Sequence, residues 1–117
     1  MSAEQSDLLL RRKYPRRHFR RKMGVLFDGK YWVANGVEVG EGGASFSLGQ
    51  AFPEGKKIVL NFQVPGGGFV SVQSEIRYTK KDRQSGLFAY GVSFLTLKFE
   101  HKREIRAYVS ARQEFEQ

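Results

Sequence analysis

Short stretches of alternating apolar and polar residues, separated by turn residues, constrain the fold of this chain most strongly. The clearest one runs from Ile58 through Leu60 and Phe62 to Val64, and a proline and three glycines follow it at residues 65–68. Alternation with a period of two is typical of a strand that buries one face. Comparable stretches begin at Met23, Tyr31, Ala44, Val70 and Phe88. We therefore predict about six strands in one domain.

Particular residues indicate how these strands turn or break. Asp28-Gly29 suits the positive φ angles of a tight hairpin. Asn35-Gly36 lies inside the returning strand and indicates a bulge or kink there. Ser74 is a polar interruption in the apolar face of the strand expected over residues 70–78.

The last part of the chain changes to a helical period. Ile105, Tyr108, Val109 and Arg112 are spaced for one face of a helix over about residues 98–114, with Phe99 expected as an earlier contact. The predicted fold class is therefore mainly β. It is a six-stranded antiparallel β-barrel with a C-terminal α-helix that packs on the barrel or plugs one end.

Positive charge is concentrated in one segment. The net charge is +8, and residues 11–22 hold eight basic side chains and no acidic one, so that the 12 remaining basic residues balance the 12 acidic ones. Such an arm attracts the phosphates of a nucleotide, a nucleic acid or a lipid surface. A solvated tail is the ordinary alternative, but Tyr14, Pro15 and Phe19 interrupt the run, and Pro15 favours an extended or turned backbone.

These observations divide the chain into three parts. We expect a flexible N-terminus at residues 1–10, a basic ligand-binding arm at residues 11–22, and a barrel with its helix at residues 23–114. Like charges in the arm repel one another and bury little apolar area. The arm is therefore expected to become ordered when a ligand neutralises part of its charge.

Several classes of protein are disfavoured by composition. The chain has no cysteine, which excludes disulfides and thiolate metal sites. No apolar run approaches the roughly 20 residues that span a bilayer, and the acidic N-terminal residues Glu4 and Asp7 are unlike a secretory signal. A cytoplasmic location is expected. His18 and His101 have no metal-ligand spacing and basic neighbours, so we expect neither a metal site nor an enzyme.

Two segments combine unusual side chains with an unusual backbone. The first contains Arg11, Arg12, Arg16 and Arg17, whose planar guanidinium groups bind phosphate with two parallel hydrogen bonds and stack on purines. The second begins at Glu38, whose carboxylate can accept hydrogen bonds from the N1–H and the exocyclic amine of guanine. Glycines at positions 40, 42 and 43 allow close approach to the backbone. A plain hairpin turn with incidental charges is the alternative for this second segment.

Together the two segments resemble the PilZ family, whose signature is RxxxR followed some 20 to 30 residues later by D/N-x-S-x-x-G. The first element matches RKYPR at residues 12–16, and EVGEGG at residues 38–43 occupies the place of the second. The resemblance continues through GGA at 42–44, PEG at 53–55 and GVSF at 91–94. It covers about residues 11–110.

The resemblance implies a receptor for the bacterial second messenger cyclic di-GMP, which is a ligand and not a cofactor. Arg12 and Arg16 would be the principal ligands of its phosphates and guanine, with Arg11 or Arg17 auxiliary. Glu38 would read guanine. In the family the last glycine of the second motif permits the turn, and Gly43 would keep that backbone role.

The chain departs from the family pattern at two positions. Glu38 replaces Asp or Asn and reaches one methylene further. Gly40 replaces Ser, which deletes a hydroxyl whose hydrogen bond is worth about 1 kcal/mol. We expect weakened binding, and a gain of about fivefold in affinity for Gly40→Ser unless Gly40 has a positive φ angle.

The predicted function is a cyclic di-GMP receptor that signals by ordering its arm and engaging an unidentified partner protein. One alternative is a PilZ module that binds proteins without nucleotide. Another is a small basic barrel that binds single-stranded nucleic acid. The confinement of the positive charge to one short segment argues against nucleic acid.

Overall fold

Seven strands and one helix make up the part of the chain that the computed structural model describes, residues 15–115. Their bounds are β1 Arg16–His18, β2 Lys22–Phe27, β3 Lys30–Gly40, β4 Gly43–Leu48, β5 Lys57–Gln63, β6 Phe69–Lys81, β7 Phe88–Phe94 and α2 Phe99–Phe115. The alternating stretches of the sequence became β2 to β7, and the positive φ of Asp28 and Gly29 makes the predicted hairpin between β2 and β3.

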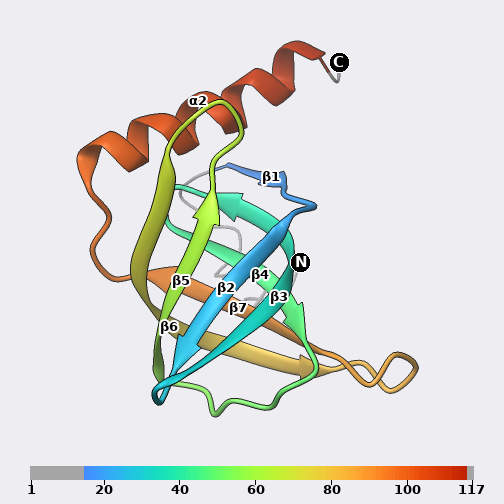
Figure 1. Cartoon of the computed structure of the whole chain (residues 1–117). Helices are drawn as coiled ribbons and strands as arrows, with labels where there is room; N and C mark the ends of the chain where they lie inside the picture. Colours follow the sequence, from blue (N-terminus) through green and yellow to red (C-terminus); the bar gives the residue numbers. More distant parts are fainter. Residues whose placement is uncertain (1–14, 116–117) are drawn as a thin grey trace, which may run out of the picture.

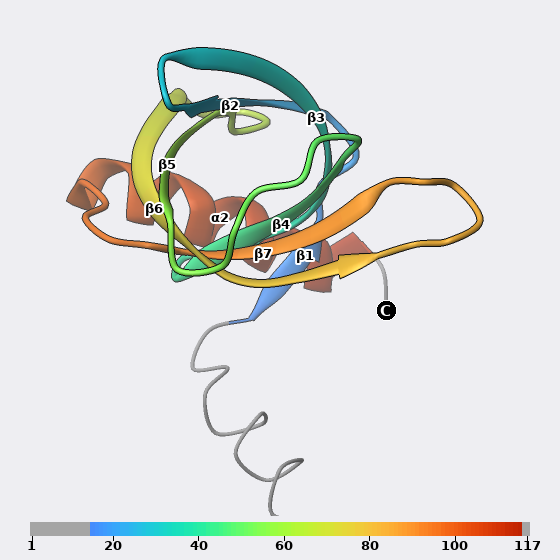
Figure 2. The same ribbon diagram turned by 90° about the horizontal axis from the view of Figure 1, so that it is seen from below.

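The strands close into a barrel. Their order is β1-β3-β2-β5-β6-β7-β4, and an additional pairing of β3 with β4 joins the two ends of the sheet. Every pairing is antiparallel. Figure 2 shows the resulting ring of strands, and Figure 1 shows α2 lying across one end. The predicted six-stranded antiparallel barrel with a C-terminal helix is confirmed, with β1 as a short additional strand.

One edge of β3 is shared between β2 and β1. Lys30–Asn35 pairs with β2, and Glu38–Gly40 pairs with β1. Between these pairings Gly36 N donates to Arg21 O at 2.8 Å, and Phe19 N donates to Val37 O at 2.9 Å. The register of β3 against β4 shifts between Gly36 and Glu38, which confirms the irregularity predicted there. Residues 16–22 of the basic arm thus lie along one edge of β3 and lead directly into β2.

The core corrects the predicted boundary of the barrel. The ordered strands begin at Arg16 and not at residue 23, and Phe19 is only 1% exposed inside the core. Its ring packs edge-on against Phe62 and Tyr108, with centroid distances of 5.6 and 6.3 Å. The expectation that the whole arm buries little apolar area is therefore wrong for its second half. Because basic residues lie on both sides of Phe19 in the sequence, the sequence pattern did not identify it as a core residue.

Two further side chains test the predicted pattern. Ser74 is fully buried, and its hydroxyl donates to Val72 O, so the polar interruption lies within the core. Phe99 is 68% exposed, so the expected contact of this ring is wrong. Among α2 residues 99–111, whose side chains the structure describes, Ile105 and Val109 are buried, one helical turn apart on the face toward the barrel.

No helix among residues 15–115 combines the length and the apolar character that crossing a membrane requires.

The position of Phe19 gives a first testable prediction. Phe19→Ala is expected to lower the free energy of unfolding by about 3–5 kcal/mol, because it empties a fully enclosed site. Phe69→Ala is the matched control, since Phe69 is 59% exposed on a strand of the same barrel. Urea denaturation measures both variants. Equal small losses would show that the arm is not part of the core.

Candidate ligand-binding site

Arg16 and Glu38 come from the two predicted motifs and lie on one face of the barrel. In the pairing of β1 with β3, Arg16 stands opposite Gly40 and His18 stands opposite Glu38. Side chains two residues apart on a strand lie on the same face of the sheet. Val39, between Glu38 and Gly40, points into the core. Glu38 and Gly40 therefore face outward, and so do their partners His18 and Arg16. Arg16 Nη1 is 3.9 Å from Glu38 Oε1, and each side chain is about one quarter exposed.

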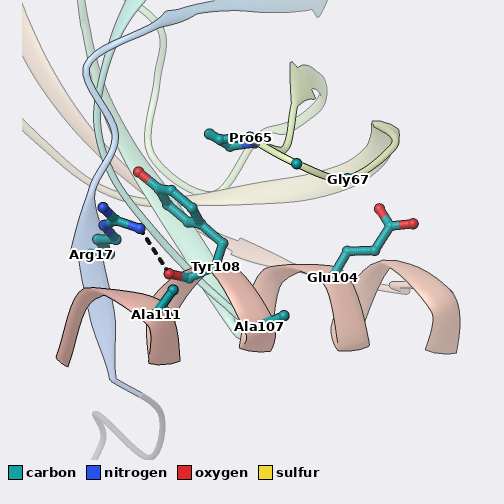
Figure 3. A pocket seen from close by; sticks show the side chains of 8 residues that line it. Arg17, Pro65, Gly67, Glu104, Ala107, Tyr108 and Ala111 are labelled. Atoms are coloured by element: carbon teal, nitrogen blue, oxygen red, sulfur yellow. Dashed lines mark hydrogen bonds between the residues drawn. The ribbon is translucent and has the colours of Figure 1, made fainter. Parts of the chain in front are cut away.

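Arg17 points the other way. It stands opposite the buried Val39, and its guanidinium lies 4.2 Å from the centre of the Tyr108 ring. Its Nη1 donates to the carbonyl oxygen of Tyr108 at 3.0 Å, as Figure 3 shows. The structure therefore gives Arg17 a contact with α2 and separates it from Arg16 and Glu38. Arg11 and Arg12, the other predicted ligands of the first motif, lie outside the described residues.

An open hollow of about 390 Å³ lies beside Arg17, between α2 and the β5–β6 turn. Its lining is small and mostly uncharged apart from Arg17 and Glu104. Glu104 accepts a hydrogen bond from Gly68 N at 2.7 Å, which ties the helix to this turn. The two charged groups thus already hold structural contacts, and the hollow lies on a different side of β1 from Glu38.

Gly40 and Gly43 are required by close packing and not by a turn conformation. Neither has a positive φ angle. A β-carbon on Gly40 would lie 2.7 Å from the carbonyl oxygen of Pro15 and 3.1 Å from Arg16 Cγ. A β-carbon on Gly43 would collide with the carbonyl oxygen of Val92 on β7. The absence of a β-carbon at Gly43 lets β4 approach β7.

The second carboxylate of the motif has a structural role. Glu41 Oε1 accepts hydrogen bonds from Arg106 Nη2 at 2.8 Å and from Arg106 Nε at 3.2 Å. The Glu41 side chain is only 11% exposed, so the pair anchors the β3–β4 turn to α2. Of the two acidic residues in EVGEGG, Glu38 faces the outer surface beside Arg16, and Glu41 is engaged with the helix.

The outer face next to Glu38 consists of small residues that sequence analysis missed. Ser45 on β4 stands opposite Glu38, and Gly91 on β7 stands opposite Ser45. Ser93 stands opposite Gly43. In the sequence, small residues alternate with core residues along β4 and along β7, and this alternation could have indicated an outer face of small residues. Only the pairing of the strands shows that the small residues of β4 and of β7 lie beside Glu38. A flat nucleotide can approach the backbone closely over such a surface.

The chemistry of this face suits an organic anion. It offers a guanidinium, a carboxylate acceptor and serine hydroxyls within a few residues of each other on adjacent strands. In the described residues no three His, Cys, Asp or Glu side chains gather in a way that could hold a metal ion. Phosphate recognition by arginine and guanine recognition by a carboxylate need no metal.

The packing of Gly40 gives a second prediction and replaces the expected gain from serine. Gly40→Ser and Gly40→Ala are both expected to lower the free energy of unfolding by about 1–3 kcal/mol, because the new β-carbon displaces Pro15 or Arg16. The alanine variant carries the β-carbon without the hydroxyl and so isolates the contribution of the hydroxyl. Chemical denaturation of the two proteins is the measurement. Full stability of Gly40→Ala would contradict the tight contact with Pro15.

Solved structures share this fold. The inhibitor of motility MotI/DgrA from Bacillus subtilis superimposes with a TM-score of 0.82 at 15% identity, over 91% of this chain and 53% of its own. PlzA from Borreliella burgdorferi, solved in complex with c-di-GMP, has a TM-score of 0.62 at 15% identity, over 91% and 45%. The PilZ domain of YcgR from Escherichia coli, solved with c-di-GMP, has a TM-score of 0.64 at 16% identity, over 89% and 96%.

The chain spans about half the length of the first two of these proteins and nearly all of the third. At such identities the likeness concerns the fold. No curated protein matches the chain in sequence. A sequence model of the PilZ domain, however, matches residues 10–111, which include both motifs, the whole barrel and most of α2. This chain therefore belongs to the PilZ domain family.

Proposed function

We propose that this protein is a receptor for cyclic di-GMP and that it signals to a partner protein. The observation that carries the proposal is the convergence of Arg16 and Glu38, from separate motifs, on one outer face. Membership of the PilZ family supports it, and the family's structural relatives PlzA and YcgR were solved with this nucleotide. In this role the chain binds and transmits and does not catalyse.

The charges of the site suit an exchange of partners when the ligand arrives. The 3.9 Å between Arg16 and Glu38 exceeds the length of a charge-assisted hydrogen bond. Partly exposed pairs of this kind contribute about 0–1 kcal/mol, so little is lost when they separate. A nucleotide can bind both groups: a phosphate oxygen can accept hydrogen bonds from Arg16, and the N1–H and amine of guanine can donate to Glu38. Adenine lacks that pair of donors, which makes Glu38 the source of selectivity.

The two motifs also have contacts through which binding can reach α2. Tyr108 on α2 contacts β1 twice. Its hydroxyl donates to His18 O at 2.7 Å, and the backbone carbonyl of Tyr108 accepts a hydrogen bond from Arg17 Nη1. Arg106 holds Glu41 in the other motif. A ligand that shifts β1 or the β3–β4 turn therefore acts directly on the helix surface, where a partner can detect it. Ordering on ligand binding was expected for the whole arm, residues 11–22. Residues 16–18 already lie in β1 and Lys22 lies in β2 in this structure. Residues 11–14 lie outside the described residues, and for them the ordering stays a prediction.

Calorimetric titration tests the receptor and the choice of arginine. The wild-type chain is expected to bind cyclic di-GMP with a dissociation constant of about 1 μM or lower. Arg16→Ala is expected to cost about 2 kcal/mol, or about thirtyfold in affinity, because it removes a direct phosphate contact. Arg21→Ala is the control, since it deletes the same charge from an exposed position and acts only through screened electrostatics. Equal losses in the two variants would contradict the assignment of Arg16.

The same titration separates the alternatives. Cyclic di-AMP, GTP and a short single-stranded oligonucleotide are the comparison ligands. Tighter binding of the oligonucleotide than of cyclic di-GMP would favour the nucleic-acid barrel. An absence of heat and of any thermal shift at millimolar cyclic di-GMP would favour the PilZ module that binds proteins without nucleotide.

A further inference from the structure

Apolar side chains lie exposed on the outer face of β2 and β3. Tyr31 and Val33 on β3 are 58% and 61% exposed, and Leu26 on β2 is 40% exposed. Tyr31 stands opposite Leu26, and Leu26 stands opposite Val59 on β5, so these side chains are neighbours across three strands. The solvent face of an antiparallel sheet is ordinarily polar. Contiguous apolar side chains on such a face commonly mark an interaction site.

The ring of Tyr31 makes this apolar surface continuous. Val33 stands opposite Gly24 on β2, which has no side chain to fill the space beside it. The ring of Tyr31 occupies the space that a β-carbon on Gly24 would need. Val33, the ring and Leu26 therefore adjoin one another over Gly24. Together with Val59 they form what we call the β2–β3 patch. Figures 1 and 2 show α2 across one end of the barrel, so that the helix leaves this side wall uncovered.

The charged side chains that border the β2–β3 patch are positive. Arg20, Arg21 and Lys22 lead into β2 at one end of the patch. Lys30 precedes Tyr31 at the other end, and Lys57 lies two residues before Val59 on the outer face of β5. All five are exposed, and none of them forms an ion pair with a carboxylate of the described residues. The patch thus combines an apolar centre with a cationic rim.

This combination selects an occupant that is both anionic and apolar. A second copy of the chain would set one cationic rim against another, and like charges oppose that contact. The side wall of a closed barrel curves outward, whereas a partner helix packs into a groove. A lipid surface fits both features, because it carries negative headgroups and yields around apolar side chains.

We propose that the β2–β3 patch binds the surface of an anionic membrane. Leu26 and Val33 enter the boundary between headgroups and acyl chains, and Tyr31 suits the same depth because its ring is apolar and its hydroxyl is polar. The lysine stems lie along the apolar centre while their ammonium groups reach the lipid phosphates. Val33 precedes Glu38 by five residues, about 17 Å along β3. The patch is therefore separate from the candidate ligand face, and the proposal goes beyond the proposed function.

Cosedimentation of the full chain with large unilamellar vesicles, without nucleotide, tests the proposal. Vesicles of phosphatidylglycerol and phosphatidylcholine in equal parts are expected to bind the wild-type chain, and vesicles of phosphatidylcholine alone are not. The basic arm also attracts anionic lipid, so the decisive variant must keep every charge. Leu26→Thr combined with Val33→Thr does so, and threonine suits a strand. This double variant is expected to bind at least about tenfold more weakly, because it removes the apolar contact with the lipid.

Matched variants control for changes elsewhere on the barrel. Phe69→Thr removes a large apolar side chain that is 59% exposed on β6, outside the patch, and is expected to bind like wild type. Lys30→Gln is expected to bind about fivefold more weakly. Lys102→Gln deletes the same charge from an exposed position on α2 and is expected to change binding less than about twofold. Thermal unfolding checks that each variant is folded, and Val33→Thr alone replaces the double variant if that protein unfolds early.

The outcomes separate this proposal from its alternatives and from the proposed function. Wild-type binding by the double variant would overturn it, because charge alone would then explain the binding. Equal losses in the double variant and Phe69→Thr would also overturn it. So would an absence of binding by the wild-type chain. Light scattering would then distinguish a second copy, whose dimer the double variant would break, from a partner protein. Titration with cyclic di-GMP is independent of the vesicles, so either proposal can fail without the other.

Discussion

The closure of the barrel depends on β3, the strand that pairs with three others. One of its edges serves β2 and then β1, and its other edge serves β4, which joins the two ends of the sheet. Closure removes exposed strand edges and fixes the register of every strand around the ring. It also fixes the site. Since β1 can pair only with the part of β3 that β2 leaves unpaired, Arg16 must lie beside Gly40 and Glu38.

The two-residue period of β1 divides the arginines between two tasks. Arg16 faces outward toward Glu38, and its neighbour Arg17 faces the helix and stacks on Tyr108. Three residues of β1 therefore connect the candidate ligand face to α2 without an intervening segment. The ion pair between Glu41 and Arg106 makes a second connection from the other motif. A ligand that bridges Arg16 and Glu38 would act on both connections together.

The sequence predicted what is encoded locally and missed what depends on pairing between distant strands. Alternation, turn dipeptides and the helical period are local, and they predicted the barrel, the β3 irregularity and α2. The direction of Arg17 depends on how β1 pairs with β3. The burial of Phe19 depends on Phe62 and Tyr108, far along the chain. Tyr78 on β6 faces outward because of the register shift between Ile76 and Tyr78, and no residue of that strand indicates this bulge in the sequence.

The glycine that replaces the family's serine is explained by the same long-range packing. The space that a side chain at position 40 would occupy is taken by the Pro15 carbonyl and the Arg16 stem. A glycine here lets the arm lie directly on β3, which is what brings the Arg16 guanidinium toward Glu38. The missing hydroxyl is thus coupled to the position of the first motif. The departure from the family pattern is a change in how the two motifs pack together, and it does not by itself indicate a site that has lost its ligand.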